Sequence, residues 1–199
     1  MNAFICGNPT RPVFGRGQMA QLATLIPADA RLMVTYGGGS VKRNGVYDQV
    51  VKALEGRSYI EFWGIEPNPT VETLRKAIAL GKENGIDFLL AVGGGSVLDG
   101  TKLIAAGVES DKDAWDLEMG RAVKGGLPFA SVMTLPATGS EMNNAAVISR
   151  SETREKYGFF GNYPEFSILD PETTYSLPPN QIANGLADIF VHVMEQYLT

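Results

Sequence analysis

The sequence predicts an α/β protein: a doubly wound parallel sheet, preceded by a small N-terminal β-hairpin and followed by the start of a second, α-helical domain. Three observations predict this fold. Apolar runs typical of strands alternate several times with helical patterns, as in sheets built from right-handed crossovers. The run at 86–92 is apolar throughout, as expected of a strand that is covered on both faces. The letters GGGSV occur at 37–41 and again at 93–97, each time directly after such a run.

The elements are expected in a regular order along the chain. The hairpin joins 4–6 to 12–14 around a Gly-Asn-Pro-Thr-Arg turn, and a short helix follows at 18–25. The remaining strands are expected at 31–36, 58–63, 86–92, 129–135 and 166–169, with an antiparallel excursion at 145–150 and 157–160. Helices are expected at 45–54, from Asn68 onward, from Gly93 onward and at 181–198. Asn68 is the expected cap of its helix, with Pro69 at the first helical position.

The Pro178–Pro179 pair divides the chain into two expected parts. Residues 1–178 form the α/β domain, and residues 179–199 form the first helix of an α-helical domain. The helical pattern continues to Thr199 without a capping residue, which predicts a truncated chain whose last helix lacks its packing partner.

The composition argues against several classes of protein. The formal net charge is −5, and lysine and arginine are scattered, which argues against nucleic acid or an anionic membrane as the main partner. No apolar run approaches the roughly 20 residues that a membrane-spanning helix needs. The single cysteine, Cys6, rules out an internal disulfide, and the N-terminus has no basic segment of a secretory signal. We therefore expect a cytoplasmic protein.

Each glycine turn is a candidate site for a phosphate. Glycines between a strand and a helix allow backbone N–H groups to approach a phosphate, and the helix N-terminus adds partial positive charge. A tight turn without a ligand is the alternative, and Asp99 and Lys102 on the helix after the second turn favour a site. The candidate phosphate-binding residues of the two turns are Gly37, Gly38, Gly39, Ser40, Gly93, Gly94, Gly95 and Ser96.

The first turn has the features of a site for a phosphorylated ribose. In dinucleotide-binding sheets, a carboxylate near this position accepts hydrogen bonds from a free 2′-hydroxyl and repels a 2′-phosphate. The segment 37–45 has no carboxylate and contains Lys42 and Arg43. The two copies of GGGSV therefore need not be redundant: one would bind the ribose phosphate and the other the pyrophosphate.

Two further segments carry polar side chains. The loop after the strand at 129–135 offers Thr138, Ser140 and Asn143 within one turn, although an ordinary Ser/Asn-rich loop is the more common explanation. Asp188 and His192 are four residues apart on the last expected helix, so they share a face and can converge on one ion. A solvated pair is the simpler alternative, because two ligands do not make a metal site.

Taken together, these motifs resemble the iron-containing alcohol dehydrogenases, specifically the branch of NADPH-dependent aldehyde reductases and butanol dehydrogenases. The resemblance extends over essentially the whole chain and implies a Rossmann-like fold of the dehydroquinate synthase type. The segments that carry it are TYGGGS (35–40), EPNP (66–69), GGGSVLDGTK (93–102), TLPATGSE (134–141), LDP (169–171) and ANGLADIFVHVMEQY (183–197).

The resemblance implies the roles of particular residues. NADP(H) contacts are implied for Gly38, Ser40, Asn68, Gly94, Gly95, Ser96, Asp99, Thr138, Asn143 and Lys156, with Tyr175 near the cofactor. Asp188 and His192 are implied as two of four ligands to Fe²⁺ or Zn²⁺, the other two being histidines of a helical C-terminal domain. The implied reaction transfers hydride between the nicotinamide and a small aldehyde or alcohol, with the metal polarising the carbonyl, in an enzyme that is usually a homodimer.

Three interpretations therefore remain. The first is the NADP-binding part of a metal-dependent alcohol dehydrogenase or aldehyde reductase that is inactive by itself. The second is a relative on the same scaffold, such as a glycerol dehydrogenase, which the EPNP and ANGLADIFVH segments disfavour. The third is a non-catalytic nucleotide-binding module.

Overall fold

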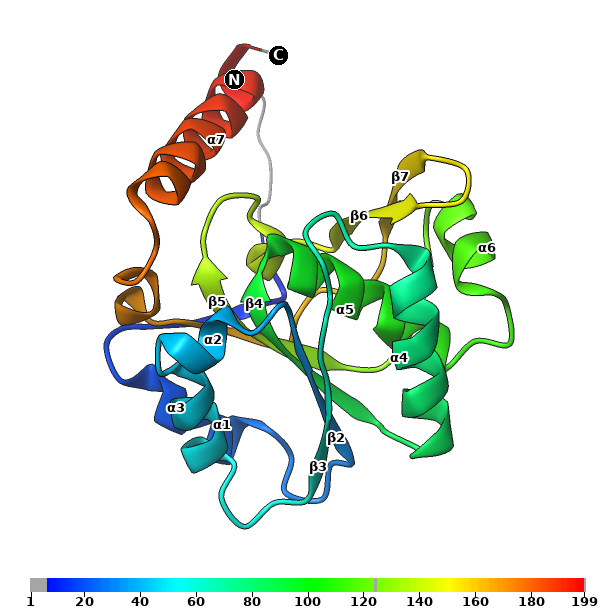
Figure 1. Cartoon of the computed structure of the whole chain (residues 1–199), viewed down its shortest axis with the longest axis horizontal. Helices are drawn as coiled ribbons and strands as arrows, with labels where there is room; N and C mark the ends of the chain where they lie inside the picture. The colour runs from blue at the N-terminus through cyan, green and yellow to red at the C-terminus, as the bar shows by residue number, and fades with distance from the viewer. Residues whose placement is uncertain (1–6, 124, 199) are drawn as a thin grey trace.

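Six parallel strands form the central sheet of the computed structural model, which describes residues 7–123 and 125–198 (Figure 1). The strand order is β1 (Arg11–Phe14), β8 (Phe166–Leu169), β5 (Phe129–Leu135), β4 (Phe88–Gly94), β2 (Leu32–Tyr36) and β3 (Tyr59–Phe62). From β2 the chain moves outward to β3, then returns to place β4 on the opposite side of β2 and continues to β5. The winding of the sheet therefore reverses between β2 and β4, which is where ligands of such sheets bind.

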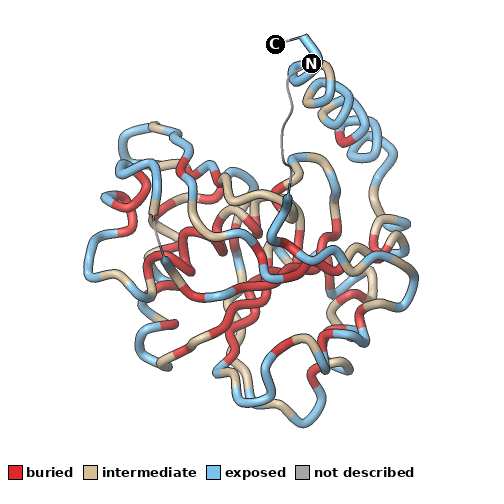
Figure 2. The backbone as a smooth tube through the Cα atoms, turned by 180° about the vertical axis from the view of Figure 1, so that it is seen from behind, coloured by how far each residue is buried: buried red, intermediate tan, exposed pale blue. Residues whose placement is uncertain are grey.

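Helices cover both faces of the sheet. One face carries α4 (Val71–Glu83), α5 (Gly95–Val108) and α6 (Ala114–Met119), and the other carries η1 (Gln18–Gln21), α1 (Leu22–Leu25), α2 (Ser40–Arg43) and α3 (Val46–Ala53). Successive strand residues alternate between the two cores, so that Leu89 packs on one face and Leu90 on the other. The backbone along the sheet is accordingly buried on both sides (Figure 2).

The antiparallel excursion consists of β6 (Ala145–Arg150) and β7 (Glu155–Phe160), which form a separate two-stranded sheet. The start of α4 holds this hairpin in place. The N–H of Ser149 donates to the carbonyl oxygen of Pro69 at 2.9 Å, and the N–H of Ser151 donates to Glu72 Oε1 at 3.1 Å. The hairpin therefore forms a fixed wall beside the carboxyl end of the main sheet.

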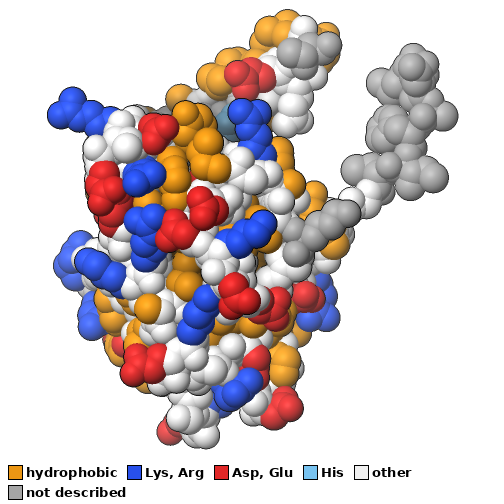
Figure 3. Space-filling model, turned by 90° about the vertical axis from the view of Figure 1, so that its right-hand side faces the viewer, with side chains coloured by type: hydrophobic (Ala, Val, Ile, Leu, Met, Phe, Trp, Pro, Cys, Tyr) orange, Lys and Arg blue, Asp and Glu red, His pale blue; other side chains and the backbone are white. Residues whose placement is uncertain are grey.

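The last helix, α7 (Pro179–Leu198), follows η3 (Pro171–Thr174) and projects from the rest of the molecule (Figure 1). Of its described residues only Gly185 is buried. Large apolar side chains on it are exposed, including Leu186, Phe190 and Val193, and some of its apolar side chains are visible at the top of the molecule (Figure 3). In the described part of the chain, no helix is both long and apolar enough to cross a membrane.

The parallel sheet and its flanking helices agree with the prediction, but some details differ. The expected first arm of the hairpin, 4–6, lies outside the described residues, so the hairpin stays a prediction, and β1 pairs in parallel with β8. The predicted cap at Asn68 is wrong. Thr70 caps α4 by accepting from the N–H of Thr73, and its own hydroxyl donates to Glu66, whereas Asn68 lies two residues earlier with φ of 55°. The short helix α6 was not expected.

Candidate functional site

The two glycine turns lie side by side at the carboxyl end of the sheet. β2 and β4 are neighbours, and their register pairs Thr35 with Ala91 and Tyr36 with Val92. Tyr36 and Val92 are the residues directly before the two GGGSV copies, so both copies begin at the same level. The register of the sheet therefore brings the repeated letters together at the point where the winding reverses.

The two turns have different backbone conformations. In the first, Gly39 has φ of 90°, a left-handed conformation that favours glycine, and α2 begins at Ser40. In the second, β4 continues through Gly94, which pairs with Leu135, and α5 begins at Gly95. The same letters thus give a left-handed turn in one copy and a direct passage from strand to helix in the other.

The glycines of the second turn have separable roles. A Cβ on Gly93 would lie 2.5 Å from Val97 Cγ2, and one on Gly95 would lie 2.6 Å from Thr138 Oγ1, so a side chain at either position would force its neighbour to move and packing alone favours glycine there. A Cβ on Gly94 would meet Leu135 Cβ at an ordinary 3.4 Å, and one on Gly38 in the first turn would meet nothing within 4 Å. Packing does not explain glycine at these last two positions, which leaves room for a ligand.

A cavity of about 710 Å³ connects the two turns. Gly37, Gly38, Ser40 and Arg43 line it from the first turn, and 94–97 line it from the second. The opposite wall includes Thr134, Leu135 and the segment 176–178. The segment 176–178 was not predicted as part of a site, and its only signal in the sequence is the Pro178–Pro179 break.

A second cavity of about 360 Å³ adjoins the first, since Gly95 and Ser96 line both. It brings together side chains from five separate segments of the chain. The predicted site residues that line it are Asn68, Gly95, Ser96, Asp99, Thr138, Ser140, Asn143, Lys156, Asp188 and His192. The second cavity therefore contains most of the residues that the sequence nominated, including both candidate metal ligands.

Asp99 is held at the base of this second cavity. Its Oδ1 accepts from the Ser140 hydroxyl at 2.7 Å, and its Oδ2 accepts from the N–H of Val147 at 3.1 Å. Burial raises the pKa of Asp99 above its ordinary value, while the bond from Ser140 and the positive charge of Lys102 oppose that shift. The carboxylate thus joins α5, the 138–143 loop and β6.

Lys156 and Asn68 meet across the second cavity. The Nζ of Lys156 on β7 donates to Asn68 Oδ1 at 2.8 Å, and the N–H of Asn68 donates to Ser96 Oγ at 3.4 Å. The left-handed backbone of Asn68 is part of this arrangement. A hydrogen-bonded series therefore runs from the hairpin to the second glycine turn.

The two cations of the first turn, Lys42 and Arg43, lie in different surroundings. Arg43 lines the larger cavity, whereas the Nζ of Lys42 lies 4.1 Å from the ring centroid of Trp63 and 5.1 Å from that of Tyr47. Trp63 in turn stacks on Tyr36, with centroids 4.0 Å apart. The aromatic faces attract the ammonium group and draw it aside, which leaves Arg43 as the cation lining the cavity.

Asp188 and His192 supply an incomplete set of metal ligands. His192 Nε2 lies 3.9 Å from Asp188 Oδ1, and both side chains are a little under half exposed. Both line the second cavity, so their donor atoms and placement suit Fe²⁺ or Zn²⁺. Within the described residues, however, no group of three or more histidine, cysteine, aspartate or glutamate side chains is placed to hold a metal. The pair fits as part of a site and not as a whole one.

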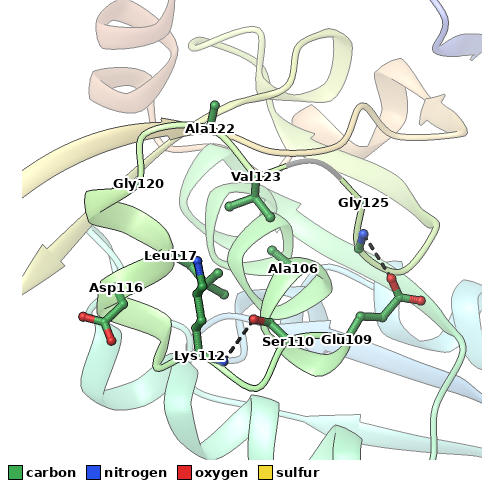
Figure 4. A pocket seen from close by; sticks show the side chains of 11 residues that line it. Ala106, Glu109, Ser110, Lys112, Asp116, Leu117, Gly120, Ala122, Val123 and Gly125 are labelled. Carbon is green, nitrogen blue, oxygen red and sulfur yellow. Dashed lines mark hydrogen bonds between the residues drawn. The ribbon is translucent and has the colours of Figure 1, made fainter.

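Three predicted residues line neither of these two cavities. Gly39 shapes the first turn and Gly93 makes room for Val97, so both act through the backbone. Tyr175 is 74% exposed and follows η3, and its neighbour Ser176 lines the larger cavity instead. A separate hollow of about 350 Å³ between α5 and α6 includes Glu109, Lys112 and Asp116 (Figure 4). None of the predicted site residues lines that hollow.

The described geometry can be compared with that of known proteins. A sequence model of the family described as iron-containing alcohol dehydrogenase matches residues 9–171. The chain belongs to the iron-containing alcohol dehydrogenase family. Within it, the NADPH-dependent aldehyde reductase YqhD of Escherichia coli (strain K12) is 53% identical over 205 residues, covering 100% of this chain and 53% of the relative. The probable NADH-dependent butanol dehydrogenase 1 of Bacillus subtilis (strain 168) is 50% identical over 203 residues, covering 99% and 52%.

Solved structures of the family have the same fold. The crystal structure of YqhD from E. coli K-12 gives a TM-score of 0.95 at 53% identity, over 100% of this chain and 52% of that one. The NADH-dependent butanol dehydrogenase A of Thermotoga maritima gives 0.92 at 40% identity, over 98% and 51%. The chain thus spans about half the length of these family members.

Proposed function

We propose that this chain is the dinucleotide-binding part of an NADPH-dependent, metal-dependent alcohol dehydrogenase or aldehyde reductase. One observation carries the proposal: two glycine turns stand level on neighbouring strands where the winding reverses, and two adjoining cavities share Gly95 and Ser96. An elongated ligand with phosphates in its middle and at one end suits this arrangement.

The larger cavity has the features of a site for the adenosine half. The pyrophosphate is assigned to the N-terminus of α5. The first backbone N–H groups of a helix have no acceptor within that helix, so they are available to a phosphate. Gly94 lies there without a packing requirement, so a phosphate can approach its backbone. The ribose phosphate is assigned to Gly38, Ser40 and Arg43 on the same cavity.

NADPH is the proposed cofactor in preference to NADH. The named dependences of the relatives differ, since YqhD is described as NADPH-dependent and the butanol dehydrogenases as NADH-dependent. The choice therefore has to rest on this chain. Its first turn has no carboxylate to repel a 2′-phosphate, and Arg43 offers a bidentate donor that matches a phosphate.

The smaller cavity is assigned to the nicotinamide and to a small aldehyde or alcohol. Asp188 and His192 would supply two ligands to Fe²⁺ or Zn²⁺ there, with the others outside the described part of the protein. Two donors do not hold such an ion tightly, so the role assigned to this chain by itself is to bind and orient the dinucleotide. Residues 1–178 are the proposed NADP-binding domain, and 179–199 the first helix of a metal-binding domain. A cytoplasmic homodimer is the proposed assembly.

Calorimetric titration of the protein with NADPH and with NADH tests this proposal. We expect NADPH to bind more tightly by roughly 10-fold or more, the scale of one charge-assisted hydrogen bond. Aldehyde reduction in the presence of added Fe²⁺ or Zn²⁺ is expected to be absent, which distinguishes a nucleotide-binding part from a complete enzyme. Failure to bind either dinucleotide would refute the proposed function, and equal affinities would refute the assignment of the ribose phosphate.

A further inference from the structure

Lys102 is a fully buried lysine on α5, and no carboxylate of the described residues lies at ion-pair distance from it. Its Nζ lies within hydrogen-bonding distance of four neutral oxygens. These are the carbonyl oxygen of Ser140 at 2.9 Å, Ser140 Oγ at 2.8 Å, Asn143 Oδ1 at 3.0 Å and the carbonyl oxygen of Ala145 at 2.7 Å. All four belong to the segment 140–145, which enters β6.

Such a lysine is a costly way to stabilise a fold. Moving an ammonium group out of water costs several kcal/mol, and apolar residues of similar volume often serve at least as well. Burial lowers the pKa of Lys102 to about 8, and the carboxylates of Asp99 on the same helix and of Glu141 in the loop oppose the shift. The retained charge therefore calls for an explanation other than stability.

The acceptors of Lys102 are the parts of the loop that line the second cavity. Ser140 accepts from Lys102 and donates to Asp99, so two residues of α5 fix one hydroxyl between them. Asn143 Oδ1 also accepts from the N–H of Ala145 at 3.0 Å. Its carbonyl is thus fully engaged, and its Nδ2 group, which has no protein partner among the described residues, remains as the donor available to a ligand.

The ammonium group also fixes the two walls of that cavity relative to each other. Ser96 and Asp99 stand on α5, and Thr138 and Asn143 stand on the loop opposite. The N–H of Ser140 donates within the loop, to Thr138 Oγ1 at 3.3 Å. Other bonds of the loop backbone run to segments other than α5: the carbonyl oxygen of Glu141 accepts from the Ser167 hydroxyl at 2.7 Å, and that of Asn144 accepts from the N–H of Gly161 at 2.9 Å. Among the described residues, Lys102 and Asp99 supply the side-chain bonds between α5 and this loop, and four of these five contacts are made by Lys102.

We propose that Lys102 is a positioning residue for dinucleotide binding, which holds the 138–145 loop against α5 so that Asn143 and Asp99 face the same ligand. The inference rests on the proposed function. Lys102 does not touch the ligand in this assignment, because it lines neither cavity. Its removal should spare the sheet and both glycine turns and disturb the loop.

The experiment compares NADPH affinity in Lys102→Met, which keeps the length of the side chain but removes the donors, with Lys76→Met, an exposed lysine on α4. We expect Lys102→Met to bind NADPH roughly 10- to 100-fold more weakly, the scale of lost hydrogen bonds to a charged group, and Lys76→Met to bind normally. Circular dichroism and urea unfolding of each variant show whether the fold is kept.

Chemical rescue separates positioning from mere space filling. Lys102→Ala lacks the atoms of one propylammonium ion, so added propylammonium should recover part of the NADPH affinity, and 1-propanol, which fills space without charge, should recover none. Normal binding by Lys102→Met would overturn the inference while leaving the proposed function intact. A Lys102→Met protein that unfolds, together with a Lys102→Ala protein that propylammonium does not restore, would show a lysine needed for the whole fold and would also overturn it. An unmodified protein that binds no dinucleotide overturns both.

Discussion

Replacing Gly94 by valine tests the second glycine turn as a site for a phosphate. The backbone at Gly94 is extended, with φ of −88°, which any residue adopts. A Cβ there makes two ordinary contacts, 3.4 Å to Leu135 Cβ and 3.8 Å to the Leu135 carbonyl oxygen, so the fold has room for the first side-chain atom. The two methyl groups beyond it would occupy the cavity at the start of α5, where the pyrophosphate is assigned.

The magnitude follows from the hydrogen bonds at risk. One backbone N–H bond to a charged phosphate is worth about 1.5–3 kcal/mol, which corresponds to roughly 10- to 150-fold in Kd. We expect Gly94→Val to lose at least that much affinity for NADPH in a calorimetric titration. The cost to stability should be about 1 kcal/mol, because a cap residue changes and the packing does not.

Gly93→Ala provides the matched control for this variant. Its Cβ would lie 2.5 Å from Val97 Cγ2 and 2.8 Å from Val97 Cβ, so Val97 has to move, at about 1–3 kcal/mol of unfolding free energy. Urea unfolding should therefore rank Gly93→Ala as the less stable protein, while calorimetry should rank Gly94→Val as the weaker binder. The reasoning fails if Gly94→Val binds NADPH as the unmodified protein does, since the turn would then be only structural.

Three more predictions concern single side chains. Arg43→Ala should weaken NADPH binding by roughly 10- to 100-fold and leave NADH binding unchanged. Lys42→Ala should leave the affinity for both dinucleotides unchanged. A larger loss of NADPH affinity in Lys42→Ala than in Arg43→Ala, measured by calorimetry, would contradict the cavity assignment. Burial raises the pKa of Glu118 to about 8, while a hydrogen bond from the backbone of Ile148 opposes that shift. Because the folded pKa lies above the ordinary 4.5, the free energy of unfolding should fall as pH rises from about 4.5 to 8. Near pH 7, Glu118→Gln should recover on the order of 3 kcal/mol of this free energy. Equal urea unfolding curves at about pH 5 and pH 8 would exclude this. Elemental analysis should find no stoichiometric Fe or Zn, because Asp188 and His192 supply only two ligands. One tightly held ion per chain would contradict the incomplete site.

Much of the sheet follows from local pattern alone. The strand at 129–135 and the first arm of the excursion at 145–150 have the predicted bounds, because each is a mainly apolar segment followed by residues that favour turns. The alternation of strands and helices also predicts a parallel sheet. The order of the strands depends on long-range pairing that no local pattern encodes. The same is true of the register that pairs Tyr36 with Val92 and so places the two turns side by side.

The side chains of the first turn show where local reasoning ends. Lys42 and Arg43 are adjacent in the sequence and both are cations, so the sequence predicts that both lie near the same phosphate. Their separation depends on Trp63, which reaches the same place from β3 and stacks on Tyr36. Similarly, asparagine is a residue type that often caps helices, but the cap of α4 is Thr70 and not Asn68. The N–H of Thr70 donates to Glu66, which holds Thr70 in the capping position.

The different surroundings of the two turns also explain why a repeated motif can serve two ends of one ligand. α5 has 14 residues, so its N-terminus offers several unpaired N–H groups and a helix dipole, and a phosphate there needs no cation beside it. α2 has only four residues and contributes little of either, so a phosphate at the first turn depends on a side chain for its charge. Arg43 lines the cavity at that turn, whereas the first charged side chain on α5 after the second turn is the acidic Asp99. We therefore expect raised salt to weaken NADPH binding more than NADH binding, since only the contact at the first turn relies on a partly exposed ion pair.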